Sequence, residues 1–406
     1  MEPLTLTRRA ACGGALALAT GPALARRVPR VLTGLDRLAS GDVGTLAGQR
    51  IGLLTHDAAV AADGRRSVDV IAGLRGVTLA ALFAPEHGLA GGAAAGEHVG
   101  DRRDTRTGLP IYSLYGARTA PEPAQLAGID WLVVDLQDAG LRCYTYAGTA
   151  MAAIRAAQVA GLRTLVLDRP NPLGAAVEGP MLDPALPLTP VTALPVPYRH
   201  GMTLGELARL LVGRNVEVAA MQGWRRADGT AVFGSGRLPF VTPSPNLRSP
   251  AAMLAYAATV LIEGTNLSEG RGTAAPFQQV GAPWLIAAPV VAALKRAGLP
   301  GVHVAPTAFT PAASKHAGSR CQGIAMTVTD ERRFNGFATG LALIAAIRAA
   351  HPDRFAFLPG KPPFFDLLAG AGAVRQGLEA GRSLAAILAD TAIGPAGYAR
   401  RDVYLY

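Results

Sequence analysis

Residues 129–172 read "IDWLVVDLQDAGLRCYTYAGTAMAAIRAAQVAGLRTLVLDRPNP". The stretch holds two continuous apolar runs, 129–138 and 162–172, and the alanine-rich segment 146–161 between them predicts a helix closed by Gly161. Uninterrupted apolar runs are typical of strands that are buried on both faces, and a helical crossover makes two such strands parallel. The stretch therefore predicts a strand, helix and strand of an α/β fold, in a parallel sheet covered on both faces.

The same pattern continues toward the N-terminus, with apolar runs at 50–56 and 77–87. In open α/β sheets the ligand crevice lies outside the carboxyl ends of the strands. We therefore expect one shared polar cleft, formed by the polar residues at the ends of the four runs: His56, Glu86, His87, Asp135, Asp138, Asp168, Arg169 and Asn171.

The pattern changes after about residue 280. Apolar runs and one helical pattern follow, and the tail 399–406 resembles a last strand. The prediction is a catalytic domain over 26–280 and a smaller α+β auxiliary domain over 281–406.

The N-terminus predicts export. Residues 6–25 hold Arg8–Arg9, a short apolar run and a small-residue cleavage site at Ala23–Ala25. The paired arginines favour the twin-arginine route over an ordinary secretion signal, so we expect a signal at 1–25 and a periplasmic or extracellular protein. In an oxidising compartment Cys143 and Cys321 could pair, or they could remain buried thiols.

Several function classes find little support. The formal net charge is +10, but the arginines are scattered and no basic stripe with aromatics predicts nucleic-acid binding. The apolar runs are too short to span a membrane. The glycine-rich loop 88–96 lacks nucleotide-binding spacing and follows an acid that would repel a phosphate, so we expect no cofactor. Histidine spacing predicts no metal site, and the chain has no G-x-S-x-G elbow of a serine hydrolase.

Carboxylate chemistry fits better. Glycoside hydrolysis needs one acid that protonates the leaving oxygen and a second group that attacks or orients a nucleophile. Glu86 follows Pro85 at a strand end, where the backbone is fixed, and His87 could orient it. Asp135, Asp138 and Asp168 are candidate partners. Each of these acids could instead serve only in a structural ion pair or cap.

Other polar residues could bind the substrate. Arg142, Arg169 and Arg271 could hold an anionic group bidentately. Tyr144 could offer a stacking face for a sugar, or it could belong to the core. His200 precedes a helix whose capping box, Thr203 and Glu206, leaves the histidine unexplained.

At these residues the chain resembles a known family. The stretches "FAPEHGLAGGAAAGEHV" (83–99), "LVVDLQDAGLRCYTY" (132–146) and "EGTNLSEGRGTAAPFQQVGAPW" (263–284) are similar to the NamZ-type exo-β-N-acetylmuramidases, and the resemblance runs from about residue 45 to the last tyrosine. It implies an exo-acting glycosidase that releases N-acetylmuramic acid from the non-reducing ends of peptidoglycan fragments. It also implies a Rossmann-like catalytic domain without a nucleotide, a smaller C-terminal domain and a site in the cleft between them.

The resemblance places the family's motifs on numbered residues. The acid motif falls on Glu86 and His87, and the other motifs fall on 135–138, 168–172, 263–266 and 270–273. Asn171, Asn266 and Arg271 belong to these motifs. Cys143 is a departure, because relatives usually carry an aromatic residue there.

The resulting hypothesis names Glu86 as the general acid/base, with His87 and Asp168 tuning it. The expected substrate-binding residues are Asp135, Asp138, Arg142, Tyr144, Arg169, Asn171, His200, Asn266 and Arg271. We expect Arg169 or Arg271 to read the lactyl carboxylate of a muramyl saccharide. A non-catalytic binder of cell-wall fragments, or another envelope hydrolase such as an esterase or amidase, remains an alternative.

Overall fold

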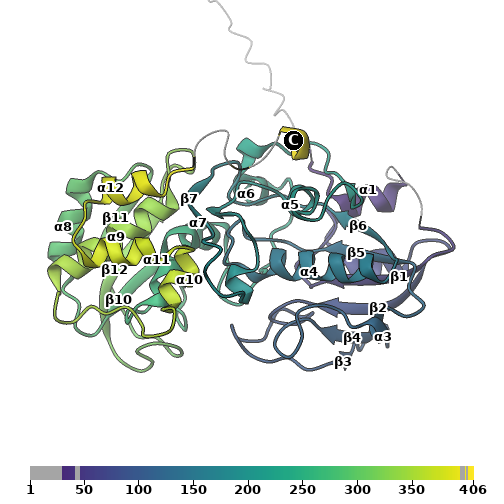
Figure 1. Cartoon of the computed structure of the whole chain (residues 1–406), viewed down its shortest axis with the longest axis horizontal. Helices are drawn as coiled ribbons and strands as arrows, with labels where there is room; N and C mark the ends of the chain where they lie inside the picture. The colour runs from purple at the N-terminus through teal and green to yellow at the C-terminus, as the bar shows by residue number, and fades with distance from the viewer. Residues whose placement is uncertain (1–29, 42–45, 394–397, 399–400) are drawn as a thin grey trace, which may run out of the picture.

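A seven-stranded sheet forms the centre of the first part of the chain (Figure 1). The computed structural model describes residues 30–41, 46–393, 398 and 401–406, so the predicted export signal at 1–25 lies outside them. The strand order is β3-β4-β2-β1-β5-β6-β9, and every neighbouring pair is parallel except β3 with β4. The parallel sheet predicted from the apolar runs is confirmed. Its strands are β1 (Arg50–Thr55), β2 (Thr78–Ala84), β3 (Arg102–Arg103), β4 (Pro110–Ser113), β5 (Trp131–Asp135), β6 (Arg163–Leu167) and β9 (Glu217–Ala219).

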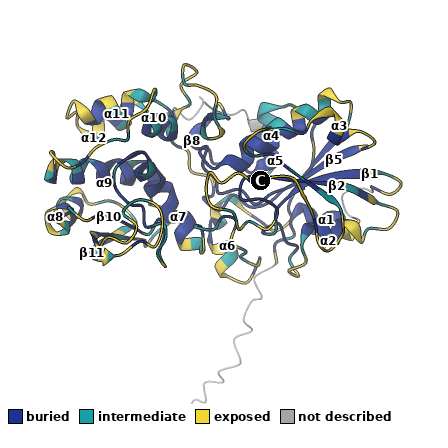
Figure 2. Cartoon of the chain, turned by 90° about the horizontal axis from the view of Figure 1, so that it is seen from below, coloured by how far each residue is buried: buried dark blue, intermediate teal, exposed yellow. Residues whose placement is uncertain are grey.

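Helices cover both faces of this sheet (Figure 2). On one face Leu53 and Val133 pack with helices α1 (Gly34–Ser40) and α2 (Ser67–Ala72). On the other face their chain neighbours Leu54 and Val134 pack with α4 (Thr145–Val159) and α5 (Leu204–Leu211). Successive residues of a strand point to opposite faces, so burial of both faces requires an apolar residue at each position. This is why the strands read as continuous apolar runs.

The second part of the chain is an α+β unit with its own sheet. Three antiparallel strands have the order β10-β12-β11, with bounds Gln279–Ala282, Cys321–Val328 and Val302–Phe309. Helix α7 (Pro250–Thr259) lies before residue 280 but packs against β12 and α9. The other helices are α8 (Ala287–Ala297), α9 (Gly336–Ala350), α10 (Phe364–Ala369), α11 (Gly372–Glu379) and α12 (Leu384–Asp390).

A short ribbon joins the two parts. Strands β7 (Glu178–Met181) and β8 (Pro197–Arg199) pair antiparallel, and Arg199 forms a buried ion pair with Glu178. The other carboxylate oxygen of Glu178 accepts a hydrogen bond of 3.1 Å from the backbone N–H of Phe337, at the start of α9. One carboxylate therefore ties the ribbon to the second part. The smaller elements are α3 (Pro123–Leu126), α6 (Ala231–Gly234) and the 3₁₀ helices at Pro190–Thr192, Arg226–Asp228 and Val260–Gly264.

The C-terminal tail differs from its prediction. Among the described residues of the tail, Arg401–Val403 forms a 3₁₀ helix, so the expectation of a last strand is wrong. Tyr406 instead packs edge to face on Trp224, with ring centroids 5.0 Å apart. Its hydroxyl donates to the buried carboxylate of Asp168 at 2.8 Å and accepts from the Met221 N–H at 2.7 Å. These contacts fix the tail by its last side chain. None of the helices in the described ranges has the length and hydropathy needed to cross a bilayer.

Candidate active site

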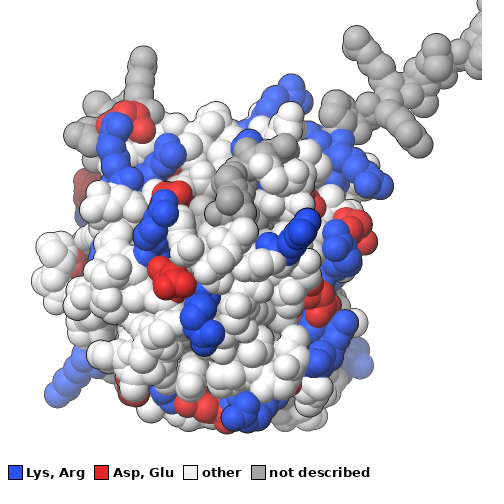
Figure 3. All heavy atoms as spheres, turned by 90° about the vertical axis from the view of Figure 1, so that its right-hand side faces the viewer, with Lys and Arg blue, Asp and Glu red and all other residues white. Residues whose placement is uncertain are grey.

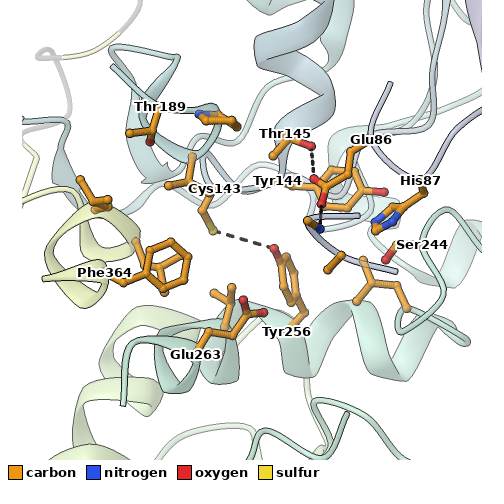
Figure 4. Close-up of a pocket in the computed structure, with 18 of the residues that line it drawn as sticks. Glu86, His87, Cys143, Tyr144, Thr145, Thr189, Ser244, Tyr256, Glu263 and Phe364 are labelled. Carbon is orange, nitrogen blue, oxygen red and sulfur yellow. Dashed lines mark hydrogen bonds between the residues drawn. The ribbon is translucent and has the colours of Figure 1, made fainter. Parts of the chain in front are cut away.

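A cavity of about 400 Å³ is lined by residues of both parts of the chain (Figure 4). From the first part come the loop after β2, the start of α4 and the segment 189–191. From the second part come the end of α7, the 3₁₀ helix that follows it and the helix α10. The cavity thus lies at the carboxyl edge of the sheet, where α/β folds bind their ligands.

Glu86 projects into this cavity from the loop after β2. Its side chain is held from two sides: the Gly96 N–H donates to Oε1 at 2.9 Å and the Thr145 hydroxyl donates to Oε2 at 2.8 Å. Only 8% of the residue is exposed. Tyr115 shares a hydrogen bond with this carboxylate, and burial, the charge of Glu86 and that hydrogen bond raise the pKa of Tyr115 to about 12. Glu86 is therefore a fixed, nearly buried acid at the wall of a ligand-sized cavity.

His87 and the residue after it set the course of the loop. His87 has φ of 70° and Gly88 has φ of 72°, so the chain enters two left-handed positions directly after Glu86. A histidine in this region of φ is strained, and such strain gathers at functional sites. The ring Nδ1 lies 2.8 Å from the Ala93 carbonyl oxygen, which accepts only, so Nδ1 carries a proton. The imidazole therefore lines the cavity in a fixed orientation beside Glu86.

The opposite wall carries a second carboxylate in a cluster of four charges. Glu263 pairs with Arg271 at 2.7 Å, Arg271 also contacts Glu269 at 3.1 Å, and Lys315 lies 3.1 Å from Glu269. Burial raises the pKa of Glu263, although the charge of Arg271 opposes this change. Figure 4 shows Glu263 and Glu86 on different walls of the cavity. The cavity thus places Glu86, an acid held by uncharged hydrogen-bond donors, opposite Glu263, an acid that is paired with a cation.

One guanidinium nitrogen of Arg271, Nη1, is available to bind a ligand. Its Nη2 donates to Glu263 and its Nε faces Glu269, while Nη1 makes no hydrogen bond to any residue in the described part of the chain. Among the described residues it is the one Lys or Arg that lines the cavity. An arginine with an unused nitrogen in a cavity is suited to bind an oxyanion.

Three of the predicted site residues besides Glu86 line this cavity: His87, Tyr144 and Arg271. Tyr144 is buried and its hydroxyl donates to the Pro243 carbonyl at 3.1 Å, so it offers a ring face with its polar end already satisfied. The other predicted residues lie outside the lining.

Asp135 and Arg169 bind each other away from the cavity. Arg169 donates to both oxygens of Asp135, at 2.5 and 2.9 Å, and to the Val60 carbonyl at 2.8 Å. Both side chains are buried. A guanidinium already committed to a bidentate carboxylate has little left for a ligand anion, so Arg271 is better placed than Arg169 to bind one.

Asp138 and His200 also face each other outside the lining. His200 Nε2 lies 3.6 Å from Asp138 Oδ2, too far for a hydrogen bond. Asp138 Oδ2 instead accepts a hydrogen bond from the Gly140 N–H at 2.6 Å. Both side chains are buried. Asp138 therefore braces the turn after β5, next to the segment that enters the cavity. Asn171 serves a similar purpose, because it donates to the Met202 carbonyl at 2.9 Å and accepts from the Leu173 N–H at 2.8 Å.

Arg142 and Asn266 bridge backbone segments instead of lining the cavity. Arg142 is 1% exposed, and its guanidinium donates to the carbonyl of Leu368, at the end of α10, at 2.8 Å. Burial lowers its pKa to about 10, so the side chain is still charged at neutral pH. Asn266 donates to the Arg354 carbonyl and accepts from the Ala356 N–H. Arg142 therefore holds α10, which supplies Phe364, Leu367 and Leu368 to the cavity wall.

Asp168 is fully buried beneath the C-terminal residue. Its carboxylate accepts hydrogen bonds from the Thr203 hydroxyl at 2.7 Å, the Gly205 N–H at 2.8 Å and the Tyr406 hydroxyl at 2.8 Å. Burial nevertheless raises the pKa of Asp168 to about 6. Its place is the junction of β6, α5 and the tail, outside the cavity lining, so it contacts neither Glu86 nor a bound ligand there.

Asp168→Asn is expected to change how stability depends on pH. A folded pKa above the ordinary value means that protonation stabilises the fold fully below about pH 4, and that this contribution is lost as the pH rises through about 6. The loss amounts to roughly 3 kcal/mol in the wild type and is absent in the asparagine variant. Urea unfolding of both proteins at several pH values measures it. Two parallel pH profiles would exclude this role of Asp168.

The site contains residues that the sequence did not single out. Thr145, Tyr115 and Glu263 contact Glu86 or Arg271, and Tyr256 and Ser244 also line the cavity. Cys143 lines it too, as a buried free thiol whose pKa burial raises to about 12, and Cys321 is likewise free and buried. Glu263 lies in the motif 263–266. The nearby predicted site residue Arg271 is the sequence signal that could have identified Glu263 as its partner.

The sequence matches a known family along most of its length. Residues 51–251 match the N-terminal part, and residues 254–406 the C-terminal part, of the exo-beta-N-acetylmuramidase NamZ family. The chain is 43% identical over 366 residues to the peptidoglycan beta-N-acetylmuramidase NamZ of Bacillus subtilis (strain 168), covering 89% of this chain and 87% of that protein.

Two solved structures from Bacteroides fragilis NCTC 9343 share the fold. The DUF1343 family protein BF0371 has a TM-score of 0.80 and 31% identity, over 87% of this chain and 92% of that chain. The DUF1343 family protein BF0379 has a TM-score of 0.69 and 30% identity, over 89% of this chain and 94% of that chain. The likeness therefore spans both parts of the molecule.

Proposed function

The chain belongs to the NamZ family of exo-β-N-acetylmuramidases, and from this premise we propose that it hydrolyses the terminal β-N-acetylmuramyl bond of peptidoglycan fragments. The observation that carries the proposal is Glu86, a carboxylate held by Gly96 and Thr145 at the wall of a cavity that both parts of the chain line. The enzyme would take one N-acetylmuramic acid at a time from the non-reducing end.

In this reaction Glu86 acts as the general acid. Its proton passes to the glycosidic oxygen as the bond between that oxygen and the anomeric carbon breaks. The oxygen of a water molecule bonds to the anomeric carbon and keeps one of its protons as the new hydroxyl. The other proton of that water restores the acid form of Glu86 over the complete cycle. Gly96 and Thr145 keep the carboxyl group in place. The two products are free N-acetylmuramic acid and a saccharide shortened by one residue.

Arg271 gives the site its preference for a muramyl sugar. N-acetylmuramic acid differs from N-acetylglucosamine by a lactyl ether that carries a carboxylate, and Nη1 of Arg271 is placed to bind such a group. A neutral sugar would leave Arg271 without this contact.

Arg271→Lys is expected to reduce this preference. Lysine keeps the charge but loses the planar fork, so the ratio of kcat/KM for a β-N-acetylmuramide to that for the matching β-N-acetylglucosaminide should fall by about 10- to 100-fold. The control is Arg375→Lys, because Arg375 is as exposed as Arg271 and pairs with a carboxylate, Asp366, away from the cavity. An unchanged ratio in the Arg271 variant would assign the lactyl group to another residue.

A chromogenic β-N-acetylmuramide tests the proposed function. The purified protein should release the chromophore from it and release much less from the matching glucosaminide. A protein that binds muramyl saccharides but releases no chromophore would be a non-catalytic binder. A protein that cleaves ester or amide substrates only would be a different envelope hydrolase.

We also propose that the enzyme acts after export from the cytoplasm. The signal pattern at 6–25 supports export by the twin-arginine route, so the enzyme would meet its substrate in the periplasm or outside the cell. Loss of export on replacement of Arg8 and Arg9 by lysine would test it.

A further inference from the structure

A second depression adjoins the cavity, and we call it the side groove. It has a volume of about 300 Å³ and lies along one side of α4. Four residues line both the side groove and the cavity: Tyr115, Thr145, Thr189 and Pro190. The two hollows therefore meet along a shared wall.

Glu86 stands at this shared wall. Of the four shared residues, Thr145 donates a hydrogen bond of 2.8 Å to Glu86 and Tyr115 also lies against its carboxylate. A glycosidic oxygen joins the sugar that is released to the sugar that leaves, and the general acid must reach that oxygen. An acid at the junction of two hollows is thus placed between two sugar positions.

The geometry points to the side groove as the site of the leaving saccharide. We propose that the terminal muramyl residue lies in the cavity and that the next sugar, an uncharged N-acetylglucosamine residue, lies in the side groove. This inference rests on the proposed function and goes beyond it, because it assigns the leaving-group position to particular residues.

The lining of the side groove suits an uncharged sugar. Leu188 and Pro190 lie at its surface, and Leu188 is 83% exposed, so its side chain is accessible to a ligand in the groove. Apolar side chains of this kind can cover the C–H face of a sugar ring. The exposed hydroxyl of Thr119 can bond to sugar hydroxyls, and no carboxylate of the described residues lines the groove. Arg155 is the one charged residue of this lining among the described residues, and its Nη2 donates to the Leu211 carbonyl at 2.9 Å. A few polar groups on an apolar wall are typical of small-ligand sites.

A third hollow is the alternative place for the leaving saccharide. It has a volume of about 490 Å³, lies beyond the loop 88–97 and is lined by Arg66, Arg102, Arg103 and Arg106. It shares only His87 with the cavity, and the ring Nδ1 of His87 is bonded to the Ala93 carbonyl. No residue common to this hollow and the cavity contacts Glu86 among the described residues, so it is less well placed to hold a sugar beside the scissile bond.

Two substrates separate binding of the leaving sugar from the rest of the reaction. One is the disaccharide N-acetylmuramyl-β-N-acetylglucosamine, and the other is methyl β-N-acetylmuramide, whose leaving group needs the same protonation but carries no sugar. The quantity measured is the ratio of kcat/KM for the disaccharide to kcat/KM for the methyl glycoside. Loss of contacts with the leaving sugar lowers this ratio, whereas damage to the fold or to Glu86 lowers both values.

The variants are Leu188→Ser, Ala152→Phe and, as the control, Arg102→Ser. Leu188→Ser removes exposed apolar surface and leaves the core intact, and Ala152→Phe fills the groove from α4. We expect the ratio to fall about tenfold or more for Ala152→Phe and severalfold for Leu188→Ser, and to stay at the wild-type value for Arg102→Ser.

Two results would overturn the assignment. One is an unchanged ratio in both groove variants. The other is a lowered ratio in Arg102→Ser alone, which would place the leaving sugar in the arginine-lined hollow. A wild type that cleaves neither substrate would instead refute the proposed function. Circular dichroism and thermal unfolding verify that the variants are folded. If Ala152→Phe does not fold, Leu188→Ser still tests the assignment.

Discussion

Glu86→Gln is expected to lower kcat for a β-N-acetylmuramide by about 10²- to 10⁴-fold, because a positioned general acid commonly contributes that much to a rate. The amide keeps the shape of the side chain. It can still accept the Gly96 N–H at Oε1, and the Thr145 hydroxyl can rotate to accept from the new amide. The free energy of unfolding should therefore change little. Steady-state kinetics with urea unfolding of the same preparation measures both effects.

A matched control is available at Glu331. This carboxylate also accepts one backbone N–H and one hydroxyl, both from Thr230, at 3.0 and 2.6 Å. It lies outside the cavity, so Glu331→Gln should keep the wild-type kcat. If Glu86→Gln and Glu331→Gln both retain full activity, the proton donor is another group.

Gly264→Ala is expected to reduce the free energy of unfolding by about 3 kcal/mol and to raise KM. A Cβ on Gly264 would lie 2.5 Å from the Cα of Phe365 and 2.6 Å from its N, and backbone atoms in α10 cannot move aside as a flexible side chain can. Displacement of α10 would move Phe364 and Leu368 in the cavity wall. Urea unfolding and substrate kinetics measure the two effects.

Gly234→Ala is the matched control for this prediction. Gly234 lies in helix α6, and a Cβ there would meet no atom within 4 Å. Its free energy of unfolding should stay within about 0.5 kcal/mol of the wild type. An equally small change for Gly264→Ala would mean that Phe365 of α10 does not pack directly against Gly264.

The architecture could be predicted because it depends on local pattern. Continuous apolar runs at 129–138 and 162–172 reveal strands buried on both faces, and the alanine-rich segment between them reveals the crossover. The position of Glu86 followed from the same reasoning, because a residue directly after a parallel strand must lie at the carboxyl edge of the sheet.

The partners of the predicted residues could not be predicted in the same way. Sequence places Asp168 at a strand end, but Tyr406, one of its two hydroxyl donors, lies 238 residues away and reaches it through the tail. Asp135 is the last residue of its strand, and its fully buried side chain is taken by Arg169. Several acids lie at strand ends, and only some of them face the cavity. Side-chain direction and tertiary packing decide which ones do, and neither can be derived from the spacing of residues.

The far wall of the site escaped prediction for a related reason. Glu263 and Arg271 come from a 3₁₀ helix and an irregular loop, where no periodicity reports which side chains face inward. Leu188 and Tyr115 also lie on connecting segments. The resemblance to a family identified the segment 263–273, but only the three-dimensional arrangement separates Arg271, which lines the cavity, from Asn266, which braces the backbone.

The most direct test of exo-acting muramidase activity uses glycan strands of defined length labelled at the reducing end. The purified protein is incubated with strands that begin with N-acetylmuramic acid, and the products are followed over time by mass spectrometry. We expect free N-acetylmuramic acid and labelled strands shortened by one residue, with no shorter internal fragments. Internal fragments, or labelled strands of unchanged length, would contradict it.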